Sequence, residues 1–111
     1  MTVLTHRGIP FRVQTQAPLP ALLRVQGITL GATIRLTGPA QDVTPELLAH
    51  EFCHVMQWRD LGTLTFVWRY LRGLLLYGYG LRHPMEREAY DYAVRSASDF
   101  VSLVGALSRV A

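Results

Sequence analysis

The chain has 111 residues, the usual size of a single domain. Half of its residues are hydrophobic and 17% are charged, a composition that excludes an intrinsically disordered protein. The net charge is +3 and the eleven cationic residues are all arginine, but they stand singly along the chain. This dispersion argues against a nucleic-acid-binding protein.

Cysteine content and hydropathy predict a cytoplasmic protein. The single cysteine, Cys53, cannot form an intrachain disulfide, and the residues before Pro10 lack the pattern of a secretory signal. The longest apolar-rich stretch, residues 61–81, is interrupted by Arg69, Arg72 and several glycines. We therefore expect no membrane span.

Residues 1–20 are predicted to form an N-terminal arm and residues 21–111 the domain. The composition from Thr2 to Val13 suits a strand or an irregular arm. Two prolines follow between residues 15 and 20, where they are expected to interrupt a helix or a central strand. Regular structure is accordingly expected to begin near Ala21.

A strand is predicted between Ile28 and Thr37, where apolar and polar residues alternate. The apolar residues just before it have the opposite parity. Either Gly27 marks a bulge, or Gly31 and Ala32 form a tight hairpin turn.

Three helices are predicted in the second half of the chain. Thr44 and Pro45 supply a capping hydroxyl and a proline at the first helical position, and Gly62 suits a C-terminal cap. The helices run from Pro45 to Leu61, from about Leu64 to Tyr77, and from Pro84 to about Leu107. The expected fold is α+β, a small antiparallel sheet or hairpin packed on three helices.

The first predicted helix carries an H-E-x-x-H pattern formed by His50, Glu51 and His54. On a helix the two histidines lie about 40° apart and can reach one ion, while the glutamate lies about 100° away. A metzincin would continue the pattern with glycine and histidine, where Gln57 and Asp60 stand. The pattern therefore predicts a metal site with an adjacent base in a protein that is not a metzincin.

The third helix offers two glutamates for the metal. Helical phase places Glu86 on an apolar stripe with Ala89, and Glu88 on the opposite side with Asp91 and Arg95. A carboxylate on an apolar stripe is costly unless a cation pairs with it. We expect Glu86 to be the third ligand and Glu88 to be solvated; the alternative is that the helix dipole favours Glu86 in a first turn.

Segments 50–57 and 83–90 together resemble the gluzincin metallopeptidases, and at this length their minimal single-domain members. In related gluzincins the third ligand opens a segment of glutamate, two variable residues, alanine and an acid. Glu86 and Ala89 match this segment, whereas Tyr90 stands where an aspartate would orient a ligand histidine. The resemblance covers nearly half of the chain.

Tyr90 and three further residues are candidates for supporting roles. Gln57 can hydrogen-bond a ligand or cap the buried site. Tyr79 and His83 precede the third helix, where they can donate to a developing oxyanion or serve in aromatic packing and helix capping. Cys53 is expected in the core rather than at the metal.

The expected function is peptide-bond hydrolysis by a zinc-dependent enzyme. His50, His54 and Glu86 would hold Zn²⁺ with a fourth position open to water, and Glu51 would act as general base. Mn²⁺ or Co²⁺ can occupy the same donors. The expected substrate is a peptide or an unfolded protein.

Two other functions fit the same residues. One is a non-catalytic or latent metal-binding interaction module, with a closed fourth position. The other is a basic peripheral module for anionic lipid or nucleic acid, with salt-sensitive binding. Apolar residues of the second helix also predict a homo-oligomer: Phe66, Val67, Trp68, Tyr70 and residues 74–76.

Overall fold

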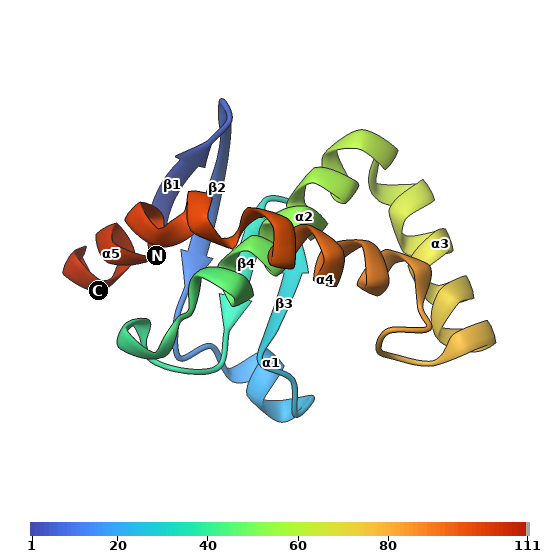
Figure 1. Ribbon diagram of the computed structural model, residues 1–111. Helices are drawn as coiled ribbons and strands as arrows, with labels where there is room; N and C mark the ends of the chain where they lie inside the picture. Colours follow the sequence, from blue (N-terminus) through green and yellow to red (C-terminus); the bar gives the residue numbers. More distant parts are fainter. Residues whose placement is uncertain (111) are drawn as a thin grey trace.

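The computed structural model describes residues 1–110 and confirms an α+β fold (Figure 1). The strands are β1 (Thr2–His6), β2 (Ile9–Gln14), β3 (Gly27–Leu30) and β4 (Thr33–Leu36). The helices are α1 (Pro18–Leu22), α2 (Pro45–Leu61), α3 (Thr63–Tyr77), α4 (Pro84–Ser96) and α5 (Val101–Val110), with 3₁₀ turns η1 (Ala40–Asp42) and η2 (Ala97–Phe100).

The four strands form one sheet in the order β1-β2-β4-β3. The pairs β1/β2 and β3/β4 are antiparallel, but β2 and β4 are parallel. The expected antiparallel hairpin is present twice, and the parallel pairing of β2 with β4 makes the sheet as a whole mixed. The two hairpins lie side by side. The connection between them, through α1, is long enough to place β4 next to β2 and parallel to it.

The N-terminal segment forms the first hairpin. Its turn residues Arg7 and Gly8 both have positive φ, as a two-residue type I′ loop requires. Phe11 and Val13 are each 1% exposed and belong to the core. Regular structure thus begins at Thr2, which corrects the expected start near Ala21.

Prolines 18 and 20 begin α1 rather than preventing a helix there. They occupy the first turn, where backbone N–H groups have no intrahelical acceptor, so the missing donors cost nothing. In the second hairpin Leu30 pairs with Thr33, and Gly31 has φ +64°. The hairpin turn at Gly31 and Ala32 is therefore the correct alternative.

The predicted bounds of α2 are confirmed. The Thr44 hydroxyl accepts a hydrogen bond from the Leu47 N–H at 3.1 Å, and Gly62 ends the helix with φ +79°. The long third helix is instead divided into α4, η2 and α5. The tighter 3₁₀ turn shifts the helical phase between α4 and α5, and Phe100 and Leu107, both 0% exposed, belong to the core.

Helix α2 lies between the sheet and α4, as Figure 1 shows. Helix α3 extends away from this centre, and of its residues only Phe66 and Gly73 are buried. Within residues 1–110, no helix combines the length and the apolar character needed to cross a bilayer.

We expect Phe100→Ala to lower the free energy of unfolding by about 3–5 kcal/mol, because it leaves a cavity where Phe100 packs against Phe52 of α2 and Tyr92 of α4. Val101→Ala is the matched control: its side chain is 60% exposed, so the change should stay within about 0.5 kcal/mol. Denaturant titration of both variants measures the difference. Equal effects would show that η2 does not anchor the C-terminal helix.

Candidate metal centre

Three residues of α2 form a buried group that could hold a metal ion. His50, Glu51 and His54 are 7%, 4% and 5% exposed. Each offers a ligand atom, and these atoms lie within 4.8 Å of one another. The arrangement follows from helix geometry, because residues one and four positions apart project toward neighbouring directions.

Glu86, in the first turn of α4, lies against both histidines. Its Oε1 atom is 3.0 Å from His50 Nε2 and 3.2 Å from His54 Nε2, and the residue is 2% exposed. Metal–ligand bonds of zinc place the ligand atoms of a tetrahedral site about 3.4 Å apart. The nitrogen–oxygen separations therefore fit ligands of a single ion, and the donor set is one that zinc accepts.

The same contacts control the charges of Glu86 and His54. Burial raises the pKa of Glu86, but hydrogen bonds from His50 and His54 and the charge of His54 outweigh it, so the net pKa is lowered. Burial lowers the pKa of His54, but the hydrogen bond and charge of Glu86 outweigh it and the net pKa is raised. The carboxylate is thus held ionised beside the two imidazoles.

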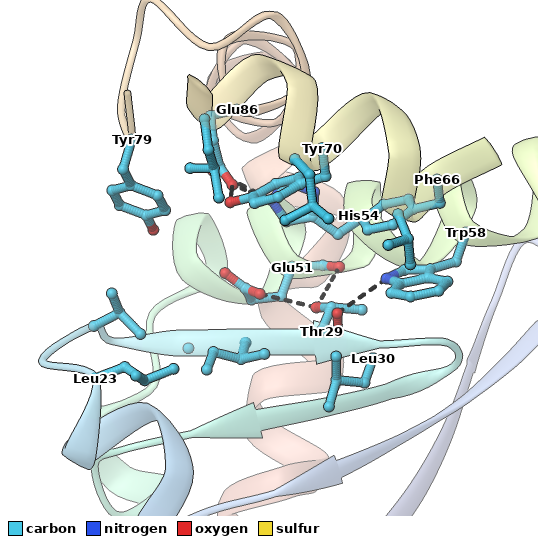
Figure 2. Close-up of a pocket in the computed structure, with 16 residues that line it drawn as sticks. Leu23, Thr29, Leu30, Glu51, His54, Trp58, Phe66, Tyr70, Tyr79 and Glu86 are labelled. Atoms are coloured by element: carbon cyan, nitrogen blue, oxygen red, sulfur yellow. Dashed lines mark hydrogen bonds and ion pairs between the residues drawn. The ribbon is translucent and has the colours of Figure 1, made fainter. Parts of the chain in front are cut away.

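Glu51 is held to one side of this contact by β3 (Figure 2). The Thr29 hydroxyl lies 2.8 Å from Glu51 Oε1, to which it donates, while Glu51 Oε2 is 3.9 Å from His50 Nε2. Burial raises the pKa of Glu51 despite the two nearby histidines. A buried carboxylate with a raised pKa is suited to accept and return a proton.

Gln57 bridges the cluster to α4. Its side-chain nitrogen donates to the Met85 carbonyl at 3.1 Å and to Glu88 Oε1 at 3.0 Å. Because both partners are acceptors, the amide oxygen must face His54, where it lies 2.7 Å from Nδ1. His54 Nδ1 therefore carries a hydrogen, and in the neutral ring the lone pair is on Nε2, toward Glu86.

Glu88 is exposed, as expected, but it is not merely solvated. Its Oε1 atom accepts the hydrogen bond from Gln57 and lies 3.9 Å from the Cys53 sulfur. Cys53 is 3% exposed and belongs to the core, and burial followed by the charge of Glu88 raises the pKa of its thiol to about 12. The sequence analysis missed the link between Glu88 and Gln57 because helical phase does not report contacts between helices.

His83 is the N-cap of α4 and not a donor into the site. Its Nδ1 accepts from the Met85 N–H at 3.2 Å, and its Nε2 donates to the Tyr70 carbonyl at 2.9 Å. The ring is 0% exposed and lies over Gly73 of α3. Both ring nitrogens are occupied, so His83 fixes the start of α4 against α3.

Two tyrosines contact the cluster in ways that the sequence did not indicate. The Tyr70 hydroxyl of α3 donates to Glu86 Oε2, the oxygen that also lies 3.2 Å from His54 Nε2. Tyr90 packs its ring at 70° to that of His50, with centroids 4.5 Å apart. Aromatic packing thus restrains His50 at the position where the gluzincin pattern would place an aspartate.

Tyr79 lies in the loop before α4 and lines the cavity beside the cluster (Figure 2). Burial, together with the charges of Glu86 and Glu51, raises the pKa of Tyr79 to about 12. The phenol therefore stays protonated at neutral pH and can donate a hydrogen bond. Among the described residues, Tyr79 makes no recorded contact with either histidine.

A cavity of about 400 Å³ opens onto these residues between α3 and β3. Its polar groups are at one side, and the remaining lining is mainly apolar, including Leu23, Ile28, Leu30, Phe66, Leu71 and Leu74 (Figure 2). The Trp58 indole stacks on Phe66 and donates to the Thr29 carbonyl at 2.9 Å. Trp58 and Thr29 were also missed, because both act across a helix–strand contact.

Comparisons with protein-family models, with curated proteins and with solved structures find no match to this chain. The residues themselves are those of an H-E-x-x-H motif, because His50, Glu51 and His54 are buried together on one helix. This cluster is a possible metal site.

Two glycine-to-alanine substitutions should have opposite effects, because Gly73 lies against His83 and Gly105 has space for a Cβ. In Gly73→Ala the new Cβ would lie 2.5 Å from His83 Cε1, so we expect a loss of about 1–3 kcal/mol in the free energy of unfolding. In Gly105→Ala the nearest atom is 3.4 Å away, and better helix propensity should add up to about 1 kcal/mol. Thermal and denaturant unfolding measure both; stabilisation by Gly73→Ala would contradict the packing of His83.

Proposed function

We propose that the protein is a zinc-dependent metallopeptidase of gluzincin type that hydrolyses peptides or unfolded proteins. The observation that carries the proposal is the position of Glu86, whose carboxylate lies against the Nε2 atoms of both His50 and His54. This gives three donors for one ion and leaves Glu51 as a separate carboxylate. Mn²⁺ and Co²⁺ can use the same donors.

The geometry supports different roles for the two glutamates. Glu86 Oε1 is within 3.2 Å of both histidines, whereas Glu51 Oε2 is 3.9 Å from His50 and Glu51 Oε1 is engaged by Thr29. A ligand must converge with the other donors on one point, while a general base must lie beside that point. We therefore assign Glu86 as ligand and Glu51 as base.

When bound, the ion would activate water near neutral pH and polarise the peptide carbonyl. Glu51 accepts the proton of the attacking water and transfers it to the leaving nitrogen, which its raised pKa favours. Tyr79 lines the same cavity and can donate to the oxygen on which negative charge develops. Tyr70 orients the Glu86 carboxylate from its other oxygen.

The alternative is a non-catalytic or latent metal-binding module that acts through interactions. The cavity beside the cluster favours the enzyme, because it gives a substrate access to Glu51 and to the open side of the donors. In a purely structural site the donors would close around the ion.

We expect Glu51→Gln to keep the metal content of the wild type while lowering peptide hydrolysis by at least about 100-fold, because the base is removed and the three ligands remain. Elemental analysis and a labelled-peptide assay measure the two properties on the same sample. Unchanged hydrolysis would refute the mechanism, and loss of metal would identify Glu51 as a ligand.

Three acidic residues of α4 should differ in their effect on zinc. Glu86→Ala removes a ligand and should abolish stoichiometric binding. Glu88→Ala releases Gln57 from one of its two acceptors and should weaken zinc affinity by up to about 10-fold. Asp91→Ala is the control, since Asp91 pairs on the surface with Arg95 at 2.9 Å. Competition with a chromogenic chelator measures all three; equal losses for Glu86→Ala and Asp91→Ala would refute the assignment.

A further inference from the structure

Helix α3 turns an apolar stripe outward. Leu64, Trp68, Leu71 and Leu75 are 87%, 68%, 57% and 86% exposed. Successive spacings of four, three and four residues place them within about 60° on one face of the helix. An amphipathic helix normally buries its apolar face. The exposed stripe of α3 is therefore a candidate surface for contact with a membrane or another molecule.

A second exposed apolar group lies across the cavity mouth, at the end of α1. Leu22 is 78% and Leu23 is 57% exposed. Leu23 and Leu71 both line the cavity that opens onto Glu51 and His54. The exposed leucines of α1 and the stripe of α3 therefore border the same opening, and we call this surface the α1–α3 face.

The segments that build the α1–α3 face carry cationic residues and no acidic ones, although Arg69 and Arg72 also line the pocket on the other side of α3 with Asp60 and Glu88. Residues 61–85 contain no acidic residue, and the first acidic residue of the chain is Asp42. Four exposed arginines belong to the segments that build the face: Arg24, Arg69, Arg72 and Arg82. An apolar stripe with Trp and Leu, flanked by cationic residues, has the composition of a helix that lies in the interface of an anionic membrane.

The same charges disfavour a second copy of the chain as the occupant. A two-fold contact places identical patches together, so Arg72, which flanks the stripe, would approach its own copy with no carboxylate on either α3 helix to compensate. Anionic lipid headgroups supply the missing negative charge, and the acyl boundary accepts the leucines.

We propose that the α1–α3 face docks on the surface of an anionic membrane, with α3 parallel to it. Docking covers the apolar stripe and brings the cavity mouth, between Leu23 and Leu71, to the lipid–water boundary. A substrate would then reach Glu51 from the membrane surface. Docking itself uses residues outside the metal cluster and does not rest on the proposed peptidase activity.

Vesicle flotation tests the docking surface with Trp68→Glu and Leu75→Glu, neither of which lines the cavity. The wild type should bind vesicles that contain phosphatidylglycerol at least about 10-fold more tightly than pure phosphatidylcholine, with the preference lost at high salt. The two variants together should lower binding by at least about 10-fold. Val101→Glu, at a 60% exposed valine of α5, is the matched control and should bind as the wild type does.

Fluorescence supplies a readout of the same event. Trp68 is exposed, so vesicles should shift its emission to the blue, and the shift should vanish in Trp68→Phe while flotation persists. Glu51→Gln should bind vesicles normally, which separates docking from catalysis.

Three results would overturn the proposal. One is an absence of vesicle binding, and another is binding that neither Trp68→Glu nor Leu75→Glu weakens relative to Val101→Glu. The third is a stable dimer in light scattering that the two variants dissociate while vesicles capture nothing. This last result would assign the face to self-association.

Discussion

The contact of the Glu86 carboxylate with two imidazoles is the interaction on which the site depends. A buried carboxylate costs several kcal/mol unless charges and hydrogen bonds compensate it. Here His50 faces Oε1, His54 lies against both oxygens, and the Tyr70 hydroxyl donates to Oε2. The contact fixes the register of α4 against α2 and involves α3 through Tyr70, so three helices converge on one carboxyl group.

Around this contact, outer hydrogen bonds set the direction of each side chain. Gln57 fixes the tautomer of His54, and the Thr29 hydroxyl holds Glu51 away from the histidines. Two glycines permit the necessary approach. A Cβ at Gly27 would lie 3.2 Å from Glu51 Cδ, and one at Gly73 would overlap the ring of His83. The positions of Glu51 and His83 therefore depend on close contacts with the backbone of β3 and α3.

Helix α3 packs against the His–Glu cluster on one side and is exposed on the other. Its buried side contributes Phe66 and Tyr70 to the site, while its apolar stripe is exposed. The helix thus serves as one wall of the cavity and as part of the α1–α3 face. If that face is covered by lipid, access to Glu51 depends on where the molecule is located as well as on the cavity itself.

The sequence by itself determined the features that arise within one helix. Thr44, Pro45 and Gly62 fixed α2, and spacing along it placed His50 beside His54. Helical phase also placed Glu86 on the buried side of α4. Only the tertiary structure decided the parallel pairing of β2 with β4, the 3₁₀ turn at Phe100, and the partners Thr29, Tyr70 and Glu88. These depend on contacts between segments far apart in the chain, and local periodicity reports the face of an element but not what packs against it.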